Sequence, residues 1–280
     1  MKKFLAVFDG YKLSKSTLAY AQELAISADA HLTGLFLDDF LYHSYSVSEA
    51  YRIYDEPEAL MKKLNAKEKS ERNKAVEQFT ESCKKAKVEF SVCRDKSLAI
   101  LELEHESMFA DLIIINENET FTQIKHKPPT PFMKDLLANV QCPVLVVPDN
   151  YKKIEKIVLL YDGGPSSMHA IKMFSYVLSN FRNLPVQVYT AKDGMKHPFH
   201  FSDAPLVKEF VKRNFKNVKC SSARGDVEKS IVNYLKRHGK NELVVLGAYR
   251  RSEFSRWFKT SMADVLMMEL DIPLFIAHNK

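Results

Sequence analysis

The sequence repeats one pattern of strands and helices, and this duplication restricts the fold more than any other feature. A strand that ends in Asp-Gly and leads into a helix occurs at Asp9 and again at Asp162. A short apolar run that opens with proline closes each copy, at Pro143 and at Pro273. A repeat far longer than the ~20–50 residues of solenoid units indicates a duplicated domain. We therefore predict two domains and a linker, at residues 1–148, 157–280 and 149–156.

Each copy alternates apolar strands with helical patterns of about ten or more residues, the arrangement that parallel strands and their crossovers require. The strands are continuous apolar runs, as at 113–115, 144–147 and 243–246, which fits burial on both faces. We predict an α/β fold in which each domain is a five-stranded parallel sheet covered by helices. The first copy carries extra residues, which we place in an insertion at about 42–69 that is rich in tyrosine at its start.

The net charge of +6 is unevenly distributed over the 280 residues. Residues 151–280 contain 22 Lys and Arg against 12 Asp and Glu, whereas the first 150 residues have an acidic excess. Such a basic half indicates an anionic ligand, an interface between complementary halves, or only solvated helix faces. The basic residues do not alternate with stacking aromatics as in a nucleic-acid module, so we do not expect a nucleic-acid partner.

The four cysteines form no CxxC pair, which favours a reducing, cytoplasmic setting. No apolar run approaches the ~20 residues of a membrane helix, so no membrane association is expected. The start, MKKFLAVFDG, is interrupted by Asp9-Gly10 and is interpreted as a strand rather than a signal peptide. His197 and His200 have a metal-ligand spacing but fall in a loop without a cysteine, and we predict no metal.

The last strand-loop-helix-strand segment of the second copy is the strongest candidate for a ligand site. The strand Leu243–Leu246 stops at Gly247, and Thr260-Ser261 opens the following helix. Free backbone N–H groups and the helix dipole meet at such a place, which favours phosphate binding. The intervening loop also carries four cations, at Arg250, Arg251, Arg256 and Lys259.

The order of these motifs resembles the universal stress protein family in its tandem form, over essentially the whole chain. The resemblance rests on both strand-Asp-Gly starts, on ADLIII and NELVVLG before the last helix of each copy, and on the proline-led final strands. In the second copy, SEFSRWFKTSMADVL resembles the loop and last helix of the family. The resemblance implies Rossmann-like domains of the adenine nucleotide alpha hydrolase type and a role in the stress response.

Nucleotide-binding members of this family have a Gly-x2-Gly-x9-Gly-Ser/Thr motif after the fourth strand. In the second copy Gly247 and Ser261 keep the first and last positions, but Arg250 and Thr260 replace the other two glycines. In the first copy the corresponding positions begin with Asn116 and Glu119. A glutamate in a phosphate site repels the ligand, so we predict that the first site is lost.

The resemblance also implies that Asp162 faces the nucleotide and that Thr190, at the end of the next strand, contacts adenine through its backbone. An aspartate at a strand-to-helix turn could equally accept backbone N–H groups and have a structural role only. Non-glycine residues in a left-handed backbone cost about 1–2 kcal/mol each, so we expect a changed loop path in the second copy. Two interpretations remain: a remodelled site for ATP or another adenine nucleotide, and a purely structural loop.

The sequence thus supports three functions. The first is a stress-response protein that acts by ligand binding or protein contact, the second a partner-binding scaffold, and the third a slow ATPase using Asp162, Arg250 and Ser261. We find no general base in the motifs and assign no catalytic residue. The resemblance further implies that the terminal strands, at 144–147 and 274–278, meet in an internal pseudo-dimer, and a homodimer is a further option.

Overall fold

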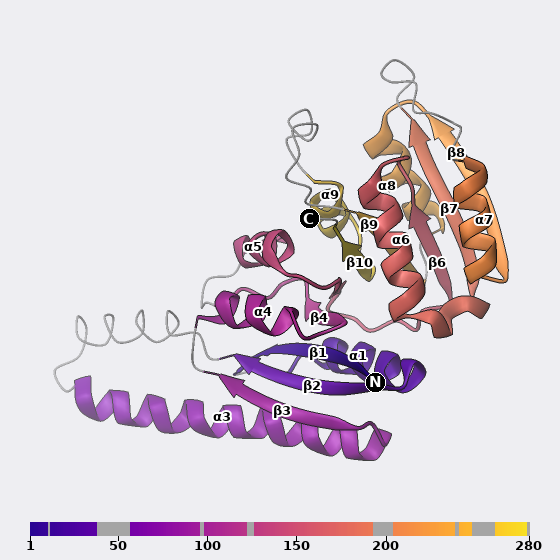
Figure 1. Cartoon of the computed structure of the whole chain (residues 1–280). Coiled ribbons are helices and arrows are strands. Elements are labelled where there is room, and N and C mark those ends of the chain that lie inside the picture. The colour runs from indigo at the N-terminus through magenta and orange to yellow at the C-terminus, as the bar shows by residue number, and fades with distance from the viewer. Residues whose placement is uncertain are drawn as a thin grey trace. The chain divides into compact units, whose positions relative to one another are not determined.

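The computed structural model of the chain describes residues 1–10, 12–37, 57–95, 98–121, 126–192, 204–238, 241–247 and 261–278. The chain forms two compact units, Met1–Gln141 and Cys142–Lys280 (Figure 1). The predicted division into residues 1–148, 149–156 and 157–280 concerns the duplicated copies and stays a prediction. No helix in the described part of the chain combines the length and the apolar character needed to cross a membrane.

The first unit alternates strands and helices as the sequence predicts. Its elements are β1 (Lys2–Asp9), α1 (Lys15–Ala28), β2 (Ala30–Leu37), α3 (Pro57–Ala86), β3 (Phe90–Asp95), α4 (Ala99–Ser107), β4 (Leu112–Asn116) and α5 (Pro131–Asn139). The strands lie in the order β3-β2-β1-β4 and pair in parallel. The chain therefore builds outward on one side of β1 and then returns to its other side with β4.

An aromatic cluster joins α3 to the sheet of the first unit. The Phe79 ring of α3 is fully buried and makes edge contacts with Phe8, Phe36 and Phe90, at centroid distances of 5.7, 5.8 and 5.8 Å. On β2, Gly34 leaves room for this ring, because a Cβ at Gly34 would lie 2.6 Å from Phe79 Cζ. This close contact fixes the position of α3 over the strands.

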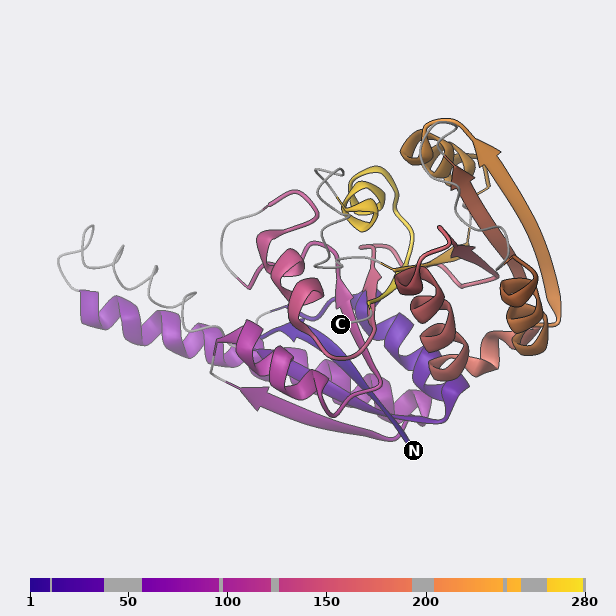
Figure 2. The same cartoon turned by 45° about the horizontal axis from the view of Figure 1, so that its top comes forward.

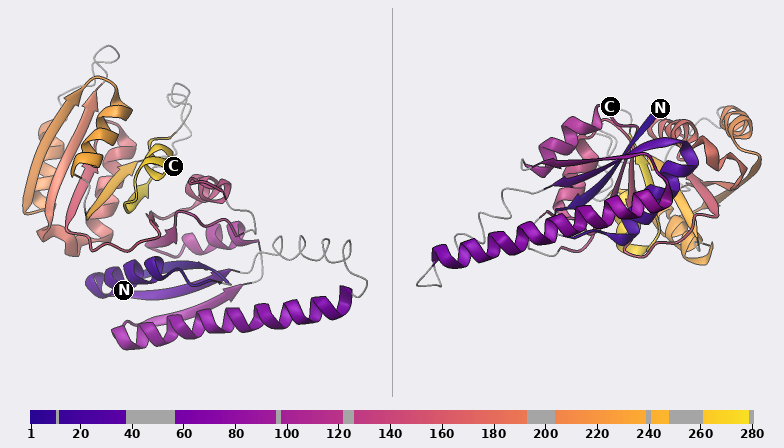
Figure 3. Two further views of the ribbon diagram at one scale, coloured as in Figure 1. Left: turned by 180° about the vertical axis from the view of Figure 1, so that it is seen from behind. Right: turned by 90° about the horizontal axis from the view of Figure 1, so that it is seen from below.

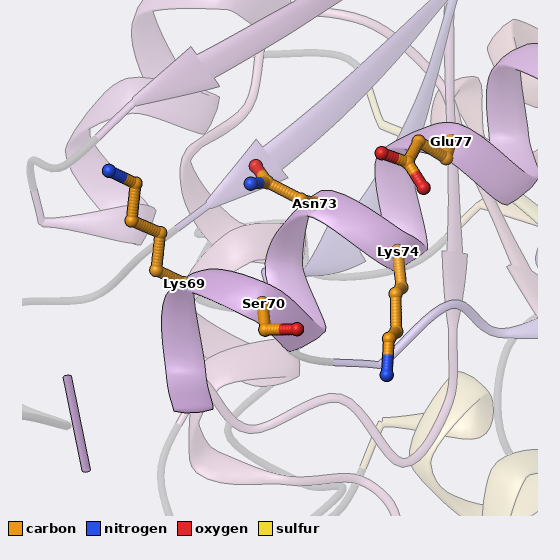
Figure 4. A pocket seen from close by; sticks show the side chains of 5 residues that line it. All are labelled: Lys69, Ser70, Asn73, Lys74 and Glu77. Carbon is orange, nitrogen blue, oxygen red and sulfur yellow. The ribbon is translucent and has the colours of Figure 1, made fainter. Parts of the chain in front are cut away.

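The described part of the predicted insertion, residues 57–69, forms the first part of the 30-residue helix α3. The helix runs along β3 and continues past the strand's carboxyl end (Figures 1 and 3). The tyrosines expected at the start of the insertion lie outside the described residues. A shallow hollow on α3 has five lining residues, Lys69, Ser70, Asn73, Lys74 and Glu77 (Figure 4). All five residues come from one helix, and they include two lysines, one glutamate and two neutral polar residues. This hollow therefore does not favour one class of ligand.

The second unit repeats this architecture and has two more strands than the first, six against four. Its elements are β5 (Val144–Val147), β6 (Lys156–Leu160), α6 (Pro165–Val177), a 3₁₀ helix (Ser179–Asn183), β7 (Pro185–Lys192), α7 (Ala204–Asn214), β8 (Asn217–Arg224), α8 (Val227–His238), β9 (Glu242–Gly247), α9 (Met262–Glu269) and β10 (Leu274–Ala277). The strand order is β5-β10-β9-β6-β7-β8. The 3₁₀ helix was not predicted, because a single short turn has no clear apolar period.

The helices of the second unit cover the sheet in two pairs (Figure 2). On α6, the buried Phe174 ring contacts Phe275 of β10 and stacks on Phe215, which follows α7. The other pair, α8 and α9, is linked by a 2.6 Å ion pair between Lys236 and Glu269. This is the doubly wound arrangement in which both faces of a mostly parallel sheet are buried.

The predicted meeting of the two terminal strands is confirmed. β5 pairs with β10 in antiparallel orientation, with Leu145 opposite Phe275. This pairing explains why β5 lies in the second unit, although the sequence pattern assigns it to the first copy. Pairing also satisfies the backbone groups of two short apolar strands that would otherwise form an edge.

Candidate functional site

The topology defines one crevice in each unit. In an open parallel sheet, ligands bind beyond the carboxyl ends of two strands where the winding direction changes. In the first unit this point lies between β1 and β4, and in the second it lies between β6 and β9. We call these the first crevice and the second crevice. Asp162 follows β6, and Gly247 is the last residue of β9. The topology therefore places both predicted residues beside the second crevice.

Asp162 has a defined structural role. Its Oδ1 accepts hydrogen bonds from the backbone N–H of Gly164 (2.7 Å) and from Ser167 Oγ (2.5 Å). Gly163 makes this turn possible with a φ of 88°, a backbone region that favours glycine. Asp162 thereby fixes the first turn of α6, as the structural alternative predicts. Its carboxylate remains exposed, so this role leaves the residue accessible to a ligand.

Gly247 is required by packing. A Cβ at this residue would lie 2.5 Å from the backbone C and O atoms of Ser166, at the start of α6. Among the described glycines, the positive φ values are those of Gly163 and Gly225, so Gly247 is not needed for a left-handed turn. The glycine lets helix α6 approach the end of β9 closely. This contact accounts for Gly247 without a phosphate.

Replacement of Gly247 by alanine is therefore expected to lower the free energy of unfolding by about 1–3 kcal/mol, the usual cost of overpacking a rigid contact. Backbone atoms of Ser166 cannot move away without shifting α6. Urea unfolding would measure the loss, and Gly247→Ser, which places a larger side chain against the same backbone atoms, should lose at least as much stability. A stability of Gly247→Ala equal to that of the wild type would contradict the packing explanation.

Ser166, in the first turn of α6, is a candidate that the motifs of the sequence do not indicate. Its Oγ is buried and makes no hydrogen bond to any described residue. A buried hydroxyl without a partner is uncommon, because its desolvation is not compensated. The helix-start position opposite Gly247 was visible in the sequence as Gly-Gly-Pro-Ser. Only the tertiary packing brings this hydroxyl to the second crevice.

The remaining predicted residues divide into two groups. Thr190 lies on β7, opposite Ser222 of β8 and close to the carboxyl end of the strand, and it is half-buried. Ser261 is the N-cap residue of α9, and its side chain makes no capping hydrogen bond. Arg250 and Thr260 lie outside the described residues, as do the neighbouring cations and the histidines considered for a metal.

The first crevice has a different arrangement, because the chain after β4 folds back into it. Glu119 N donates to Asn116 O (3.2 Å), and the backbone O of Glu119 accepts from Thr130 Oγ1 (2.7 Å). Thr130 also caps α5 by accepting from the N–H of Met133 (3.1 Å). The Thr130 hydroxyl thus both donates and accepts a hydrogen bond. In contrast, the Ser261 hydroxyl at the start of α9 makes no capping bond.

The side chain of Glu119 lies near Asp9, at the end of β1. Burial is the main reason that the pKa of Glu119 is raised to about 8, and the charge of Asp9 raises it further. The exclusion of a phosphate by the charge of Glu119 stays a prediction; the bonds of the Glu119 backbone to Asn116 and Thr130 show in addition that the chain itself turns back at this place.

One group of possible metal ligands occurs in the described residues, and it lies away from both crevices. Glu102, His105 and Glu106 share one side of α4, with ligand atoms within 4.8 Å of one another. Glu106 already forms a 2.8 Å ion pair with Lys3. A cation would have to compete with this lysine, so we assign no metal to the group.

Comparison with known proteins identifies the fold. No family model and no curated protein matches the sequence. Among solved structures, a universal stress protein from Archaeoglobus fulgidus DSM 4304 matches with a TM-score of 0.70 and 11% identity, over 99% of this chain and 96% of that one. A candidate universal stress protein from Pseudomonas aeruginosa UCBPP-PA14 matches with a TM-score of 0.54 and 16% identity, over 99% and 92% of the two chains. The chain therefore has the tandem α/β fold of the universal stress proteins, as its sequence predicts.

Proposed function

We propose that the chain is a universal stress protein that acts by binding a ligand, and that the second crevice takes ATP or another adenine nucleotide. The observation that carries the proposal is the set of polar groups that the described residues bring to the second crevice. These are the exposed carboxylate of Asp162, the buried Ser166 hydroxyl without a hydrogen-bond partner among the described residues, and the Ser261 hydroxyl, which makes no capping bond.

The residues of the second crevice have the chemistry that a nucleotide needs. The hydroxyls and the first N–H groups of α6 and α9 can donate to phosphate oxygens. Arg250 and its neighbouring cations follow Gly247 in the sequence and can supply positive charge to the same place. Thr190, on the adjacent strand β7, would contact the base through its backbone.

A partner-binding scaffold is the second candidate, and a specific observation favours it. Asp162 and Gly247 both have sufficient structural reasons to be present, one as a helix cap and the other as a packing contact. Neither residue therefore requires a nucleotide. The antiparallel pairing of β5 and β10 supports a further proposal, an internal pseudo-dimer of the two copies. We also propose a homodimer and a cytoplasmic location.

Titration of ATP into the purified protein by calorimetry distinguishes these candidates. We expect binding that Arg250→Glu weakens by about tenfold or more, because a charge-assisted hydrogen bond to phosphate becomes a repulsion. Ser261→Ala should weaken it less. Arg213→Glu is the matched control, since it makes the same charge change on α7, where Arg213 pairs with Glu209.

The outcomes separate the functions. No heat at millimolar ATP would remove the nucleotide proposal and leave the scaffold. Equal losses of ATP affinity in Arg250→Glu and Arg213→Glu would show that the effect comes from the net charge of the protein and not from a contact between Arg250 and the phosphates. Release of phosphate during the titration would support the slow ATPase, and it should then disappear in Arg250→Glu.

A further inference from the structure

The strand β8 forms an edge of the sheet in the second unit. It is the last strand in the strand order, and it pairs in parallel with β7 without interruption from Asn217 to Arg224 (Figures 1 and 2). Because the pairing is continuous, no bulge bends the strand away from a newcomer, and its sequence contains no proline. Among the described strands, none pairs with the outer side of β8. Its outer backbone N–H and C=O groups can therefore pair with another chain.

The side chains of β8 leave this backbone accessible. Six of its eight residues are exposed and the other two are half-buried. The middle of the strand, residues 220–223, consists of one cysteine, two serines and one alanine. Such small side chains do not shield the backbone edge from a strand that approaches beside it.

Cations surround this edge, and acids do not. Residues 212–224 include five Lys or Arg and no Asp or Glu, and all five cationic side chains are exposed. Two of them lie on β8 itself, one at an odd and one at an even position, so each face of the strand carries one positive charge. The five cations are Lys212, Arg213, Lys216, Lys219 and Arg224.

This charge decides which kind of chain fits the edge. A second copy of β8 would bring like charges together, and a lysine on an edge strand is a usual protection against such self-pairing. A strand with acidic residues on both faces would instead place opposite charges beside the cations of β8. A nucleic acid fits less well, because the aromatic residue within 212–224, Phe215, is 3% exposed and offers no surface for base stacking.

We propose that β8 is a docking edge for an extended acidic segment of a partner protein, which joins the sheet as a further strand. Backbone hydrogen bonds supply the affinity, whereas Lys219 and Arg224 select acidic side chains on the two faces. Docking at β8 is independent of nucleotide binding at the second crevice. It gives a partner-binding scaffold a defined surface and a defined chemistry of partner.

Fluorescence anisotropy of labelled peptides with the full chain tests this docking. The acidic peptide has eight residues, the length of β8, in which glutamate pairs alternate with valine pairs, so that acids occupy both faces of a strand. We expect it to bind, and a rise in salt from about 0.05 to about 0.5 M should weaken binding several-fold, because exposed charges are screened. The same peptide with lysine in place of glutamate should not bind.

A methylated peptide separates strand addition from simple attraction between charges. It has the acidic sequence with every backbone nitrogen methylated, so it keeps its charges but cannot donate backbone hydrogen bonds. We expect its affinity to be lower by about tenfold or more, because several hydrogen bonds of the ladder are lost. Equal affinity of the two acidic peptides would overturn the proposal and indicate a general surface for polyanions.

Matched charge reversals locate the binding site. Lys219→Glu should weaken binding of the acidic peptide by about fivefold, because an attraction across neighbouring strands becomes a repulsion. Lys172→Glu makes the same charge change at an exposed position of α6 and should leave the affinity unchanged. Circular dichroism would check that both variants keep the fold of the wild type. Equal losses in the two variants, or no binding of the acidic peptide by the wild type, would overturn the proposal.

Sedimentation of the wild type tests the remaining occupant, a second copy of the chain. We expect the Cys220 thiol, which is exposed on β8, to react with a thiol reagent at the same rate at low and high protein concentration. A dimer that shields Cys220 from the reagent would assign β8 to a second copy and would overturn the proposal.

Discussion

Replacement of Lys156 by methionine is expected to destabilise the protein by about 3 kcal/mol at pH 8, because it leaves a buried carboxyl group without its cation. Glu242, at the start of β9, has a side chain that is completely buried, and its Oε1 is paired with Lys156 Nζ at the start of β6. The other oxygen, Oε2, is buried and has no hydrogen-bond partner among the described residues. The ion pair is thus the main compensation for the burial of this charge.

The loss should depend on pH in a definite direction. Burial raises the pKa of Glu242 above its ordinary value, and Lys156 acts against this rise. Without Lys156 the pKa rises further, so the folded state retains a proton that the unfolded chain releases above about pH 4.5. The stability of Lys156→Met should therefore fall as pH rises from the ordinary pKa, and the cost should be small at pH 4.5.

Urea unfolding of the wild type and of Lys156→Met at pH 4.5 and pH 8 measures this effect. The double variant Lys156→Met, Glu242→Met removes both charges and should recover most of the loss, since an apolar pair of similar volume often matches a buried ion pair. If the double variant is no better than the single one, the loss comes from the packing of Lys156 near the Tyr234 ring, 5.8 Å from its centroid. ATP affinity should stay the same, because this pair lies at the amino ends of the strands.

Replacement of Phe79 by alanine should cost about 4 kcal/mol, the range measured when a buried aromatic ring leaves a cavity. Phe79 is fully buried and contacts three other phenylalanine rings of the first unit. Its loss removes the aromatic contacts between α3 and the sheet. Urea unfolding of the first unit measures the change, with Phe109→Ala as a control because that ring is 63% exposed.

A second substitution distinguishes a specific contact from general loss of apolar area. Gly34→Ala should destabilise the wild type, since its Cβ would lie 2.6 Å from Phe79 Cζ. In the Phe79→Ala background the same change fills part of the cavity, so it should be neutral or stabilising. Additive effects of the two substitutions would contradict a direct contact, because residues that touch are coupled.

Much of the fold was predictable because it depends on patterns that are local in the sequence. Continuous apolar strands and periodic helices indicated parallel α/β units, and the repeated Asp-Gly and proline positions indicated duplication. The crevices could also be located, since the carboxyl ends of parallel strands lie at one edge of the sheet. The structure describes four of the six predicted site residues, Asp162, Thr190, Gly247 and Ser261, and topology places them at that edge.

The roles of these residues could not be read from the sequence, because each depends on a contact between distant segments. Gly247 is explained by Ser166, and the buried Ser166 hydroxyl is evident only once α6 lies on β9. The assignment of β5 to the second unit depends on its pairing with β10. Glu119 shows the same limit: a glutamate in the sequence predicts an ordinary charged side chain, whereas burial and the charge of Asp9 raise its pKa to about 8 in the folded chain.

The sequence by itself determined the α/β class, the duplication and the edge of each sheet where a ligand would bind, because hydrophobic period and turn residues are set by neighbours along the chain. Only the tertiary structure decided that the first crevice is filled by its own loop and that Asp162 and Gly247 have structural roles. Hydrogen bonds, burial and pKa depend on atoms that the fold brings together from separate elements, and no local pattern contains them.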